Sequence, residues 1–366
     1  MDPTTGFCPK KNCPARGQSG QGHIGLHSQQ EQRFLCHAGH KTFSARPGTV
    51  FSRLRPSAET VVLVVTWLAH GCPVPALVAA LGVDERTVAA WWARSGRQGQ
   101  AGQEALGERP RALGQGQADE SRVKKQGSLV WMALALMVQT RVWLGGEGSE
   151  QRDMTLSRRL SERVRRGAAH RPLLCCPDGL VSSIRALRET LRAPGQTGQG
   201  GRPRRRPWRH VLMAQVVKRS ERRRVVETAR RMVEGPPARG ETLRRRSQGD
   251  GVLNTAYSER LTATFRARLA PLARRCRALA RQTLTRRHGM SLIGTVSNFG
   301  TPHERLGVAG GQQTPAMAAG ITDHCWSVRA LLSFHVPPPR WTPPTPRGRP
   351  AQALKRLIAR WCGNHG

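Results

Sequence analysis

Short apolar runs between residues 115 and 220 limit the folds open to this chain more than any other feature. They have the length of buried strands, are rich in β-forming residues and are closed by glycine, proline or charged residues. The runs are "SLVWMALALMV", "TRVWLGG", "RPLLCCP" and "RHVLMAQVVKR". A weaker run, "GQADESRVKK", comes before them. These segments predict the strands of one buried sheet.

Amphipathic helices are predicted between and after these strands. "DMTLSRRLSERVRR" and "VSSIRALRETLR" space their apolar residues as a helix buried on one face does. A longer helix, "LNTAYSERLTATFRARLAPLARR", follows the last strand. The order is three strands, a helix, a strand, a helix, a strand and a closing helix. It predicts an α/β domain with a mixed five-stranded sheet over residues 115–310.

The rest of the chain has a different composition on each side of this domain. We predict a Cys-, His- and Gly-rich module over residues 1–50, helices over residues 51–98 and a linker over residues 99–114. Residues 311–366 are expected to form a Gly- and Pro-rich basic extension that ends in a short helix. A chain of 366 residues is long enough for several such domains.

The charge of the chain indicates a polyanionic partner. Lys and Arg number 60 against 23 Asp and Glu, which gives a formal net charge of +37. Neutralising nucleic-acid phosphates releases condensed counterions, so we expect the partner to be DNA, although charge alone does not distinguish DNA from RNA. The longest apolar run, 129–138, is shorter than the roughly 20 residues that span a bilayer. We expect a cytoplasmic protein that binds no membrane.

The helical region over residues 51–98 has the pattern of a helix-turn-helix. "PVPALVAALG" begins with prolines and stops at Gly82, and "VDERTVAAWWARSG" restarts with Asp84 as an N-cap and closes at Gly96. The second helix of such a motif enters the major groove of DNA. An ordinary helical hairpin has the same pattern. The candidate DNA-contacting residues are Glu85, Arg86 and Arg94.

Cysteines and histidines near the start of the chain predict a structural zinc site. Cys8 and Cys13 are separated by four residues, and Cys36 follows the strand-like "QRFLC". A closed zinc site needs four ligands, and His40 is the predicted fourth, with His37 as a second candidate. The other interpretation is a site that has lost its metal.

Three acidic residues are candidates for catalysis by hard cations. Asp119 lies on the first predicted strand, Asp178 follows the strand "RPLLCCP", and Glu259 lies on the closing helix. Carboxylates that converge from such elements suit Mg²⁺ or Mn²⁺, and two such ions can assist phosphodiester displacement. Each acid taken alone is better explained as a helix cap, a turn residue or a surface ion pair.

Several of these segments resemble the catalytic blocks of bacterial insertion-sequence DDE transposases. They are "QADESRVKKQG", "WMALALMVQTRVWLGG", "LLCCPDGLVSS" and "NTAYSERLTATFR". The opening "CPKKNCPARG…RFLCHAGHKTFS" and the helix-turn-helix resemble the front end of the InsA/InsB-like group. The resemblance implies a ribonuclease-H-like catalytic domain in which Asp119, Asp178 and Glu259 hold two Mg²⁺ or Mn²⁺ ions.

The resemblance also implies the reaction and the partners. It implies hydrolysis at the terminal repeats of the element, then attack of the freed 3′-hydroxyl on target DNA, by a homo-oligomer associated with the bacterial nucleoid. Position 39, a glycine in this chain, is where relatives carry the fourth zinc ligand. The expected DNA-contacting residues around the acids are Arg204, Arg205, Arg206, Asn254, Arg260 and Arg266.

Two other functions remain open at this point. The chain could be a decayed transposase that only binds specific DNA sequences, because Gly39, Ser121, Ser258 and Ser297 stand where a ligand or larger side chains are expected. Burying an unpaired hydroxyl costs about 1–3 kcal/mol. The chain could also be a structure-selective nuclease with the same two-metal site.

Overall fold

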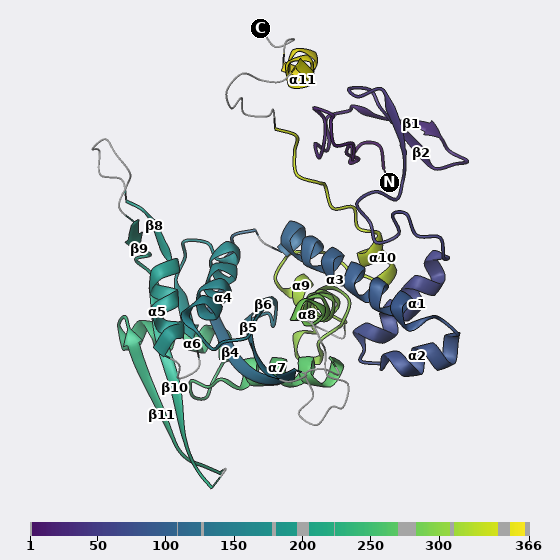
Figure 1. The fold of residues 1–366 in the computed structure, drawn as a ribbon. Coiled ribbons are helices and arrows are strands. Elements are labelled where there is room, and N and C mark those ends of the chain that lie inside the picture. Colours follow the sequence, from purple (N-terminus) through teal and green to yellow (C-terminus); the bar gives the residue numbers. More distant parts are fainter. Residues whose placement is uncertain are drawn as a thin grey trace. The chain divides into compact units, whose positions relative to one another are not determined.

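The computed structural model describes residues 2–107, 109–125, 128–177, 181–195, 205–222, 224–269, 283–307, 311–342 and 352–362 (Figure 1). The chain divides into two compact units. The first combines residues 1–58 with residues 332–366, and the second spans residues 59–331. Within the described part of the chain, no helix has both the length and the apolar character that crossing a membrane requires.

The larger unit is built on a six-stranded mixed sheet in the order β11-β10-β7-β4-β5-β6. Strands β7 and β10 run parallel to each other, and β7 runs parallel to β4, whereas the other neighbours are antiparallel. The strands are β4 (Gly114–Lys125), β5 (Ser128–Met137), β6 (Trp143–Ser149), β7 (Leu173–Cys176), β10 (Val211–Glu221) and β11 (Arg224–Glu234).

Helices cover both faces of this sheet, because its central strands are apolar on both sides. On β5, Ala133 and Ala135 pack in one core with α4 (Met154–Gly167) and α5 (Val181–Thr190). Met132 and Leu134 point the other way, into a core with α7 (Ala256–Arg268) and α8 (Thr283–Phe299). Helix α6 (Pro237–Gln248) covers β7 and β10 on that second face. The predicted mixed α/β architecture is therefore confirmed.

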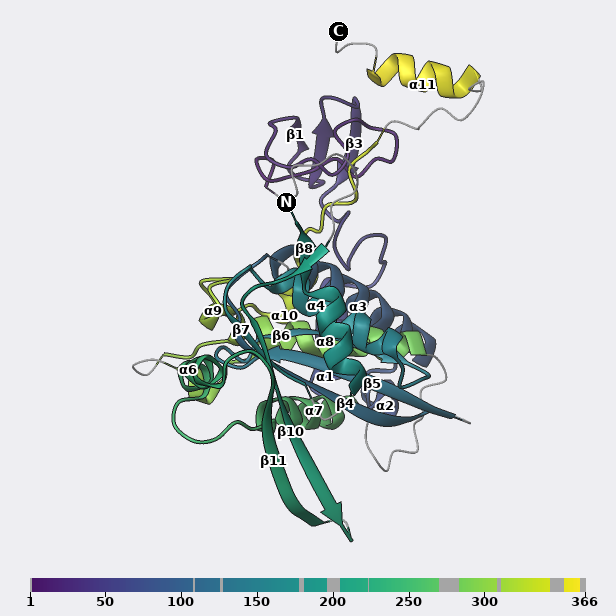
Figure 2. The same cartoon turned by 90° about the vertical axis from the view of Figure 1, so that its left-hand side faces the viewer.

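The prediction of five strands is wrong by one. The segment "RVVETARRMVE", which is not among the predicted strands, forms β11 and pairs with β10 in a long antiparallel hairpin that both views show (Figures 1 and 2). Its basic residues are exposed, so the strand shows little of the apolar pattern that marks a buried one. The turn before it contains Arg222 at φ 46 and lacks the Gly or Asn that usually signals a hairpin.

The predicted end of the second helix of the helix-turn-helix pattern at Gly96 is also wrong. Helix α3 (Glu85–Gly107) continues for another three turns into the predicted linker. A Cβ atom on Gly96 would lie 2.3 Å from the backbone oxygen of His288, and one on Gly99 would lie 3.2 Å from that of Ser291. These glycines therefore permit close contact between α3 and α8, and they do not stop the helix.

The start of α3 and the helix before it agree with the sequence. Asp84 Oδ1 accepts hydrogen bonds from the N–H groups of Arg86 (2.9 Å) and Thr87 (3.2 Å), as an N-cap does. Helix α2 (Val74–Leu81) begins after Pro73 and ends at Gly82, which has φ 62. It follows α1 (Ala58–Ala69) and packs on α3.

The smaller unit contains a three-stranded antiparallel sheet of β1 (Ile24–Ser28), β2 (Arg33–Cys36) and β3 (Lys41–Ser44). The Pro-rich segment after residue 332 packs against it, which the sequence did not indicate. The hydrogen bonds are Val336 N–H to the Gly48 carbonyl (3.1 Å), Arg16 Nε to the Pro339 carbonyl (3.1 Å) and His335 Nε2 to the Ala45 carbonyl (2.7 Å).

Short elements complete the described chain. They are β8 (Arg192–Pro194), β9 (Arg205–Pro207), the 3₁₀ turn Glu304–Leu306, α9 (Pro315–Ala318), α10 (Val328–Ser333) and α11 (Gln352–Cys362). Strands β8 and β9 pair with each other alone, and α11 lies in the smaller unit.

Candidate active site and metal centre

Strand β4 and helix α7 are joined by a regular ladder of polar contacts. Alternate residues of the strand point to the same face, and residues four apart on the helix face them. The contacts are Ser258 N–H to Gln117 Oε1 (3.2 Å), Thr262 Oγ1 to Asp119 Oδ2 (2.7 Å) and Arg266 Nη2 to Ser121 Oγ (2.7 Å). Asp119 is the central strand residue of this ladder, so its carboxylate faces α7.

Burial is the largest influence on Asp119. It raises the pKa of this carboxyl above the ordinary value, and the negative charge of Glu259 raises it further. The hydrogen bond from Thr262 and the positive charge of Arg266 act in the opposite direction. Asp119 is therefore a buried acid whose ionised form is disfavoured by burial and by the charge of Glu259.

Glu259 lies on α7 one turn before Thr262, and its side chain is 49% exposed. It accepts a hydrogen bond from Thr255 Oγ1 (2.7 Å) and forms an ion pair with Lys218 Nζ of β10. Burial acts to raise the pKa of Glu259, but the bonds from Lys218 and Thr255 outweigh it and leave the pKa below the ordinary value. The sequence did not predict the ion pair of Lys218, because it joins a strand and a helix that are far apart along the chain.

Two of the three predicted catalytic acids therefore lie on packed neighbours, Asp119 on β4 and Glu259 on α7, and the third, Asp178, lies outside the described residues. Strand β7 ends at Cys176, two residues before Asp178 in the sequence. Cys176 pairs with Gln117 of β4, and Gln117 comes two residues before Asp119.

Glu120 faces the opposite side of the sheet, as the alternation of a strand predicts. Its side chain is 3% exposed and forms an ion pair with Arg152 at 2.8 Å. The hydroxyl groups of Ser157 (3.4 Å) and Ser183 (3.3 Å) also donate to it. Glu120 is thus an anchor for the α4 and α5 side of the domain, separate from Asp119.

The serines that suggested decay have hydrogen-bond partners. Ser121 accepts from Arg266, and the hydroxyl of Ser258 donates to the Thr255 carbonyl at 2.9 Å. Ser297 accepts a hydrogen bond from Arg268 Nη1 at 3.2 Å. The cost expected for unpaired buried hydroxyls is therefore absent, and these positions no longer argue for a destabilised fold.

Asn254 has a structural position beside the acids. Its Oδ1 accepts from the Ala256 N–H at 3.1 Å at the start of α7, and its carbonyl accepts from Gln117 Nε2 at 2.6 Å. Asn254 therefore ties the helix that carries Glu259 to the strand that carries Asp119. Arg266 is likewise engaged within the protein, whereas Arg260 is exposed.

The other predicted DNA-contacting residues lie on the surface to different degrees. Glu85 and Arg86 are exposed on the first turn of α3, and Arg94 is partly buried. Arg205 and Arg206 are exposed on β9. Arg204 lies outside the described residues.

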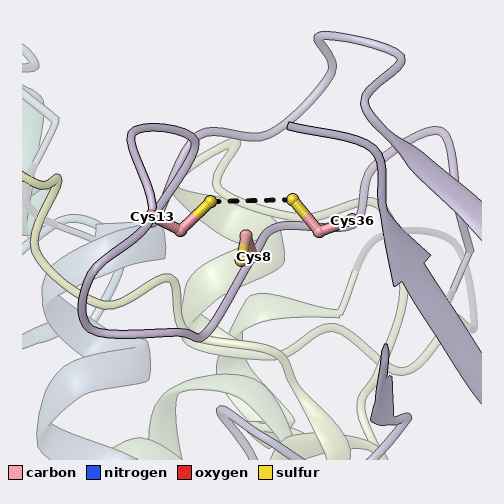
Figure 3. A group of neighbouring side chains, drawn as sticks. All are labelled: Cys8, Cys13 and Cys36. Atoms are coloured by element: carbon pink, nitrogen blue, oxygen red, sulfur yellow. Dashed lines mark hydrogen bonds between the residues drawn. The ribbon is translucent and has the colours of Figure 1, made fainter. Parts of the chain in front are cut away.

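The thiol groups of Cys8, Cys13 and Cys36 meet in the smaller unit (Figure 3). All three residues are buried, and their sulfur atoms lie within 4.8 Å of one another, with Cys13 Sγ and Cys36 Sγ 3.7 Å apart. Burial raises the pKa of the Cys8 thiol to about 12 and also raises that of Cys13. The backbone N–H groups of Lys10 and Ala15 hydrogen-bond these two sulfurs and act in the opposite direction.

This triad could hold a metal ion, which agrees in part with the prediction. Thiolates that accept backbone N–H bonds are suitable ligands for zinc. The predicted fourth ligand, His40, is exposed and does not belong to the group. Its backbone has φ 47, in the left-handed region. Among the described residues, the group contains the three cysteines only.

The structure is a mixed α/β protein with a buried acid, Asp119, held against helix α7, and a buried thiol cluster that could hold a metal. Comparisons with protein-family models, curated proteins and solved structures found no match for this chain.

Proposed function

We propose that this chain is a DDE transposase of a bacterial insertion sequence, which cleaves and joins DNA at terminal repeats. The observation that carries the proposal is the β4–α7 ladder, which fixes Asp119 against Thr262 of α7, the helix on which Glu259 lies one turn earlier. Asp119 and Glu259 are 140 positions apart in a chain that is poor in acids, and the pKa of Asp119 responds to the charge of Glu259. Such a pair of carboxylates is what the resemblance implies for two members of the triad.

The order of elements supports a ribonuclease-H-like catalytic domain. The expected succession of three strands, a helix, a strand, a helix and a strand is present as β4 to β6, α4, β7, α5 and β10. Strand β4, which carries Asp119, and strand β7, which ends two residues before Asp178 in the sequence, are parallel neighbours. Helix α7, which carries Glu259, packs on β4.

Asp119 and Glu259 would hold Mg²⁺ or Mn²⁺ together with Asp178. Carboxylate oxygens are the donors that these hard cations prefer. Bound divalent ions stabilise the attacking and leaving oxygens of a phosphodiester displacement. Lys218 would have to leave Glu259 before that carboxylate could bind an ion. Within the protein itself, Thr262 orients Asp119 and Thr255 orients Glu259.

Exposed basic residues around the sheet support DNA as the substrate. Arg219, Arg222 and Arg224 are exposed near the turn of the β10–β11 hairpin, in addition to Arg260 on α7. Such side chains hold the phosphate backbone without reading the bases. Base recognition is assigned to Arg86 on the exposed first turn of α3, where a helix-turn-helix contacts the major groove.

The buried thiols support zinc as a structural ion in the smaller unit. A small three-stranded sheet with few large apolar residues gains much of its stability from such an ion. Without a metal ion, the three cysteines would stay as free thiols and form only a small apolar core.

A plasmid cleavage assay tests the catalytic proposal. The zinc-loaded full chain is incubated with Mg²⁺ or Mn²⁺ and supercoiled DNA that carries the terminal repeats of the element. We expect nicking and strand transfer by the native chain and a loss of at least about a hundredfold in Asp119→Asn, Asp178→Ala and Glu259→Gln. Asp250→Asn, which removes an exposed carboxylate beyond α6, is the matched control.

One observation favours a second function, sequence-specific DNA binding without catalysis. The ammonium group of Lys218 already pairs with the Glu259 carboxylate and so takes the place that a catalytic metal ion would need. Specific binding of the repeats, with no cleavage in either metal and the same affinity in Asp119→Asn, would favour this alternative over catalysis. Cleavage without strand joining or repeat preference would identify a nuclease.

A further inference from the structure

Gly39 occupies the side of the thiol cluster where a fourth side-chain ligand would be expected. A Cβ atom added to Gly39 would lie 2.8 Å from Cys13 Sγ and 3.8 Å from Cys36 Sγ. Gly39 does not have a positive φ, so the backbone there is compatible with any residue type. The position therefore faces the cluster and contributes no ligand to it.

The nearby histidines lie elsewhere. His40 and His37 are both exposed and lie outside the thiol group. The His37 ring lies over β1, where a Cβ on Gly25 would be 2.6 Å from its Nε2 atom. Three thiolates are therefore the ligands that the described residues bring together, and a zinc ion prefers four.

A basic pocket opens beside the same position. It has a volume of about 370 Å³, and its lining includes both Cys13 and Gly39. Lys10, Lys11 and Lys41 of the small sheet unit also line it, and α11 adds Arg356, Arg360 and two apolar residues. None of the described lining residues is acidic. The pocket therefore attracts anions to the edge of the thiol cluster.

We propose that the metal held by Cys8, Cys13 and Cys36 keeps an exchangeable fourth position beside Gly39 that takes a phosphate oxygen. This inference rests on the proposed zinc site and is independent of the catalytic acids. A divalent ion with three thiolates has one net negative charge, so a singly charged fourth ligand, such as a phosphodiester oxygen, gives it the charge of a four-thiolate site. Lys10, Lys11 and Lys41 offset the added charge. The phosphate oxygen could come from free phosphate or from the DNA backbone.

Cobalt substitution tests this proposal, because the absorption of Co²⁺ reports thiolate number and the identity of the fourth ligand. The full chain is loaded with Co²⁺ and titrated with inorganic phosphate and, separately, with a short DNA duplex. We expect sulfur-to-cobalt charge transfer from three thiolates and ligand-field bands that shift as phosphate is added. A shift with DNA at lower concentration than with free phosphate identifies the backbone as the source.

Variants of the chain separate the possible outcomes. Gly39→Cys should raise the charge-transfer intensity by about one third and abolish the response to phosphate, because it adds a fourth thiolate. Gly39→Ala adds the Cβ without a thiol; Cys13 Sγ must shift by a few tenths of an ångström to accommodate it, and the intensity should stay that of three thiolates. Replacing Lys10, Lys11 and Lys41 by glutamine should raise the phosphate concentration at half-shift at least about tenfold, whereas Lys355→Gln, outside the pocket, should not.

Each remaining result contradicts a defined part of the inference. Absence of charge transfer in the native chain refutes the metal site itself, whatever the fate of the catalytic proposal. Charge transfer with bands that ignore phosphate and DNA refutes the exchangeable position, because water or a protein group then holds it. A native spectrum already as intense as that of Gly39→Cys would indicate a fourth cysteine ligand and would also refute it.

Discussion

Thr262→Val is expected to destabilise the chain by an amount that depends on the charge of Asp119. Thr262 is 2% exposed and donates to Asp119 Oδ2 at 2.7 Å. A hydrogen bond to a charged group contributes about 1.5–3 kcal/mol, whereas one between neutral groups contributes about 0.5–1.5 kcal/mol. Valine keeps the shape of threonine and removes the donor. The loss should therefore be about 1.5–3 kcal/mol when Asp119 is ionised and about half that when it is protonated.

The sign of the pH dependence follows from the direction of the pKa shift. Burial raises the pKa of Asp119, so the folded protein holds this proton more tightly than the unfolded chain. Ionising Asp119 therefore costs stability as pH rises from the ordinary aspartate pKa, about 3.9, to the raised value. Because the Thr262 bond lowers this pKa, its removal increases that cost. The gap between the two proteins should therefore be largest when Asp119 is ionised in both, and should narrow to about half as pH falls below the raised pKa of Asp119.

Urea unfolding followed by tryptophan fluorescence, in a series of buffers from about pH 3 to about pH 8, measures this gap. Thr262→Ser is the control because it keeps the hydroxyl group, and it should show a gap that does not widen with pH. The reasoning is refuted if Thr262→Val shows the same loss at every pH, or if serine and valine behave alike. Either result would mean that the hydroxyl does not act on the carboxylate.

Other perturbations test the packing around the site. Gly96→Ala should lower stability by about 1–3 kcal/mol in thermal unfolding, because its Cβ would overlap the backbone of α8. Asn298→Ala should cost about 2–4 kcal/mol and speed hydrogen exchange in β6, because its buried amide bonds both the N–H and the carbonyl of Trp143 at 2.8 Å. Lys218→Met should raise the pKa of Glu259, measured by NMR titration, because the Lys218 bond lowers it; an unchanged pKa would contradict the ion pair.

The elements set by local chemistry were predictable from the sequence. The strand "SLVWMALALMV" is apolar on both faces because helices cover both sides of it, and a continuous run of this kind is recognisable. The N-cap at Asp84 and the stop at Gly82 depend on a few neighbouring residues only. The placement of Asp119 and Glu259 at one site was expected through the resemblance rather than from their spacing.

The features that were missed depend on contacts between distant segments. Helix α8 contains Gly289 and Gly294, which read as helix breakers, but they make room for the indole rings of Trp92 and Trp143. The ion pair of Lys218 with Glu259 requires the β10–β11 hairpin, whose second strand has a mostly exposed, basic surface. The local sequence pattern does not predict such contacts, because they form only when distant segments of the chain pack together.

Manganese binding measured by electron paramagnetic resonance tests the central claim most directly, because bound Mn²⁺ loses the sharp signal of the free ion. The claim is that Asp119 and Glu259 share a divalent cation in the zinc-loaded chain. We expect Asp119→Asn and Glu259→Gln each to weaken the binding at least about tenfold, equal to about 1.4 kcal/mol, and Asp250→Asn to leave it unchanged. Equal Mn²⁺ affinity in all four proteins would contradict the claim.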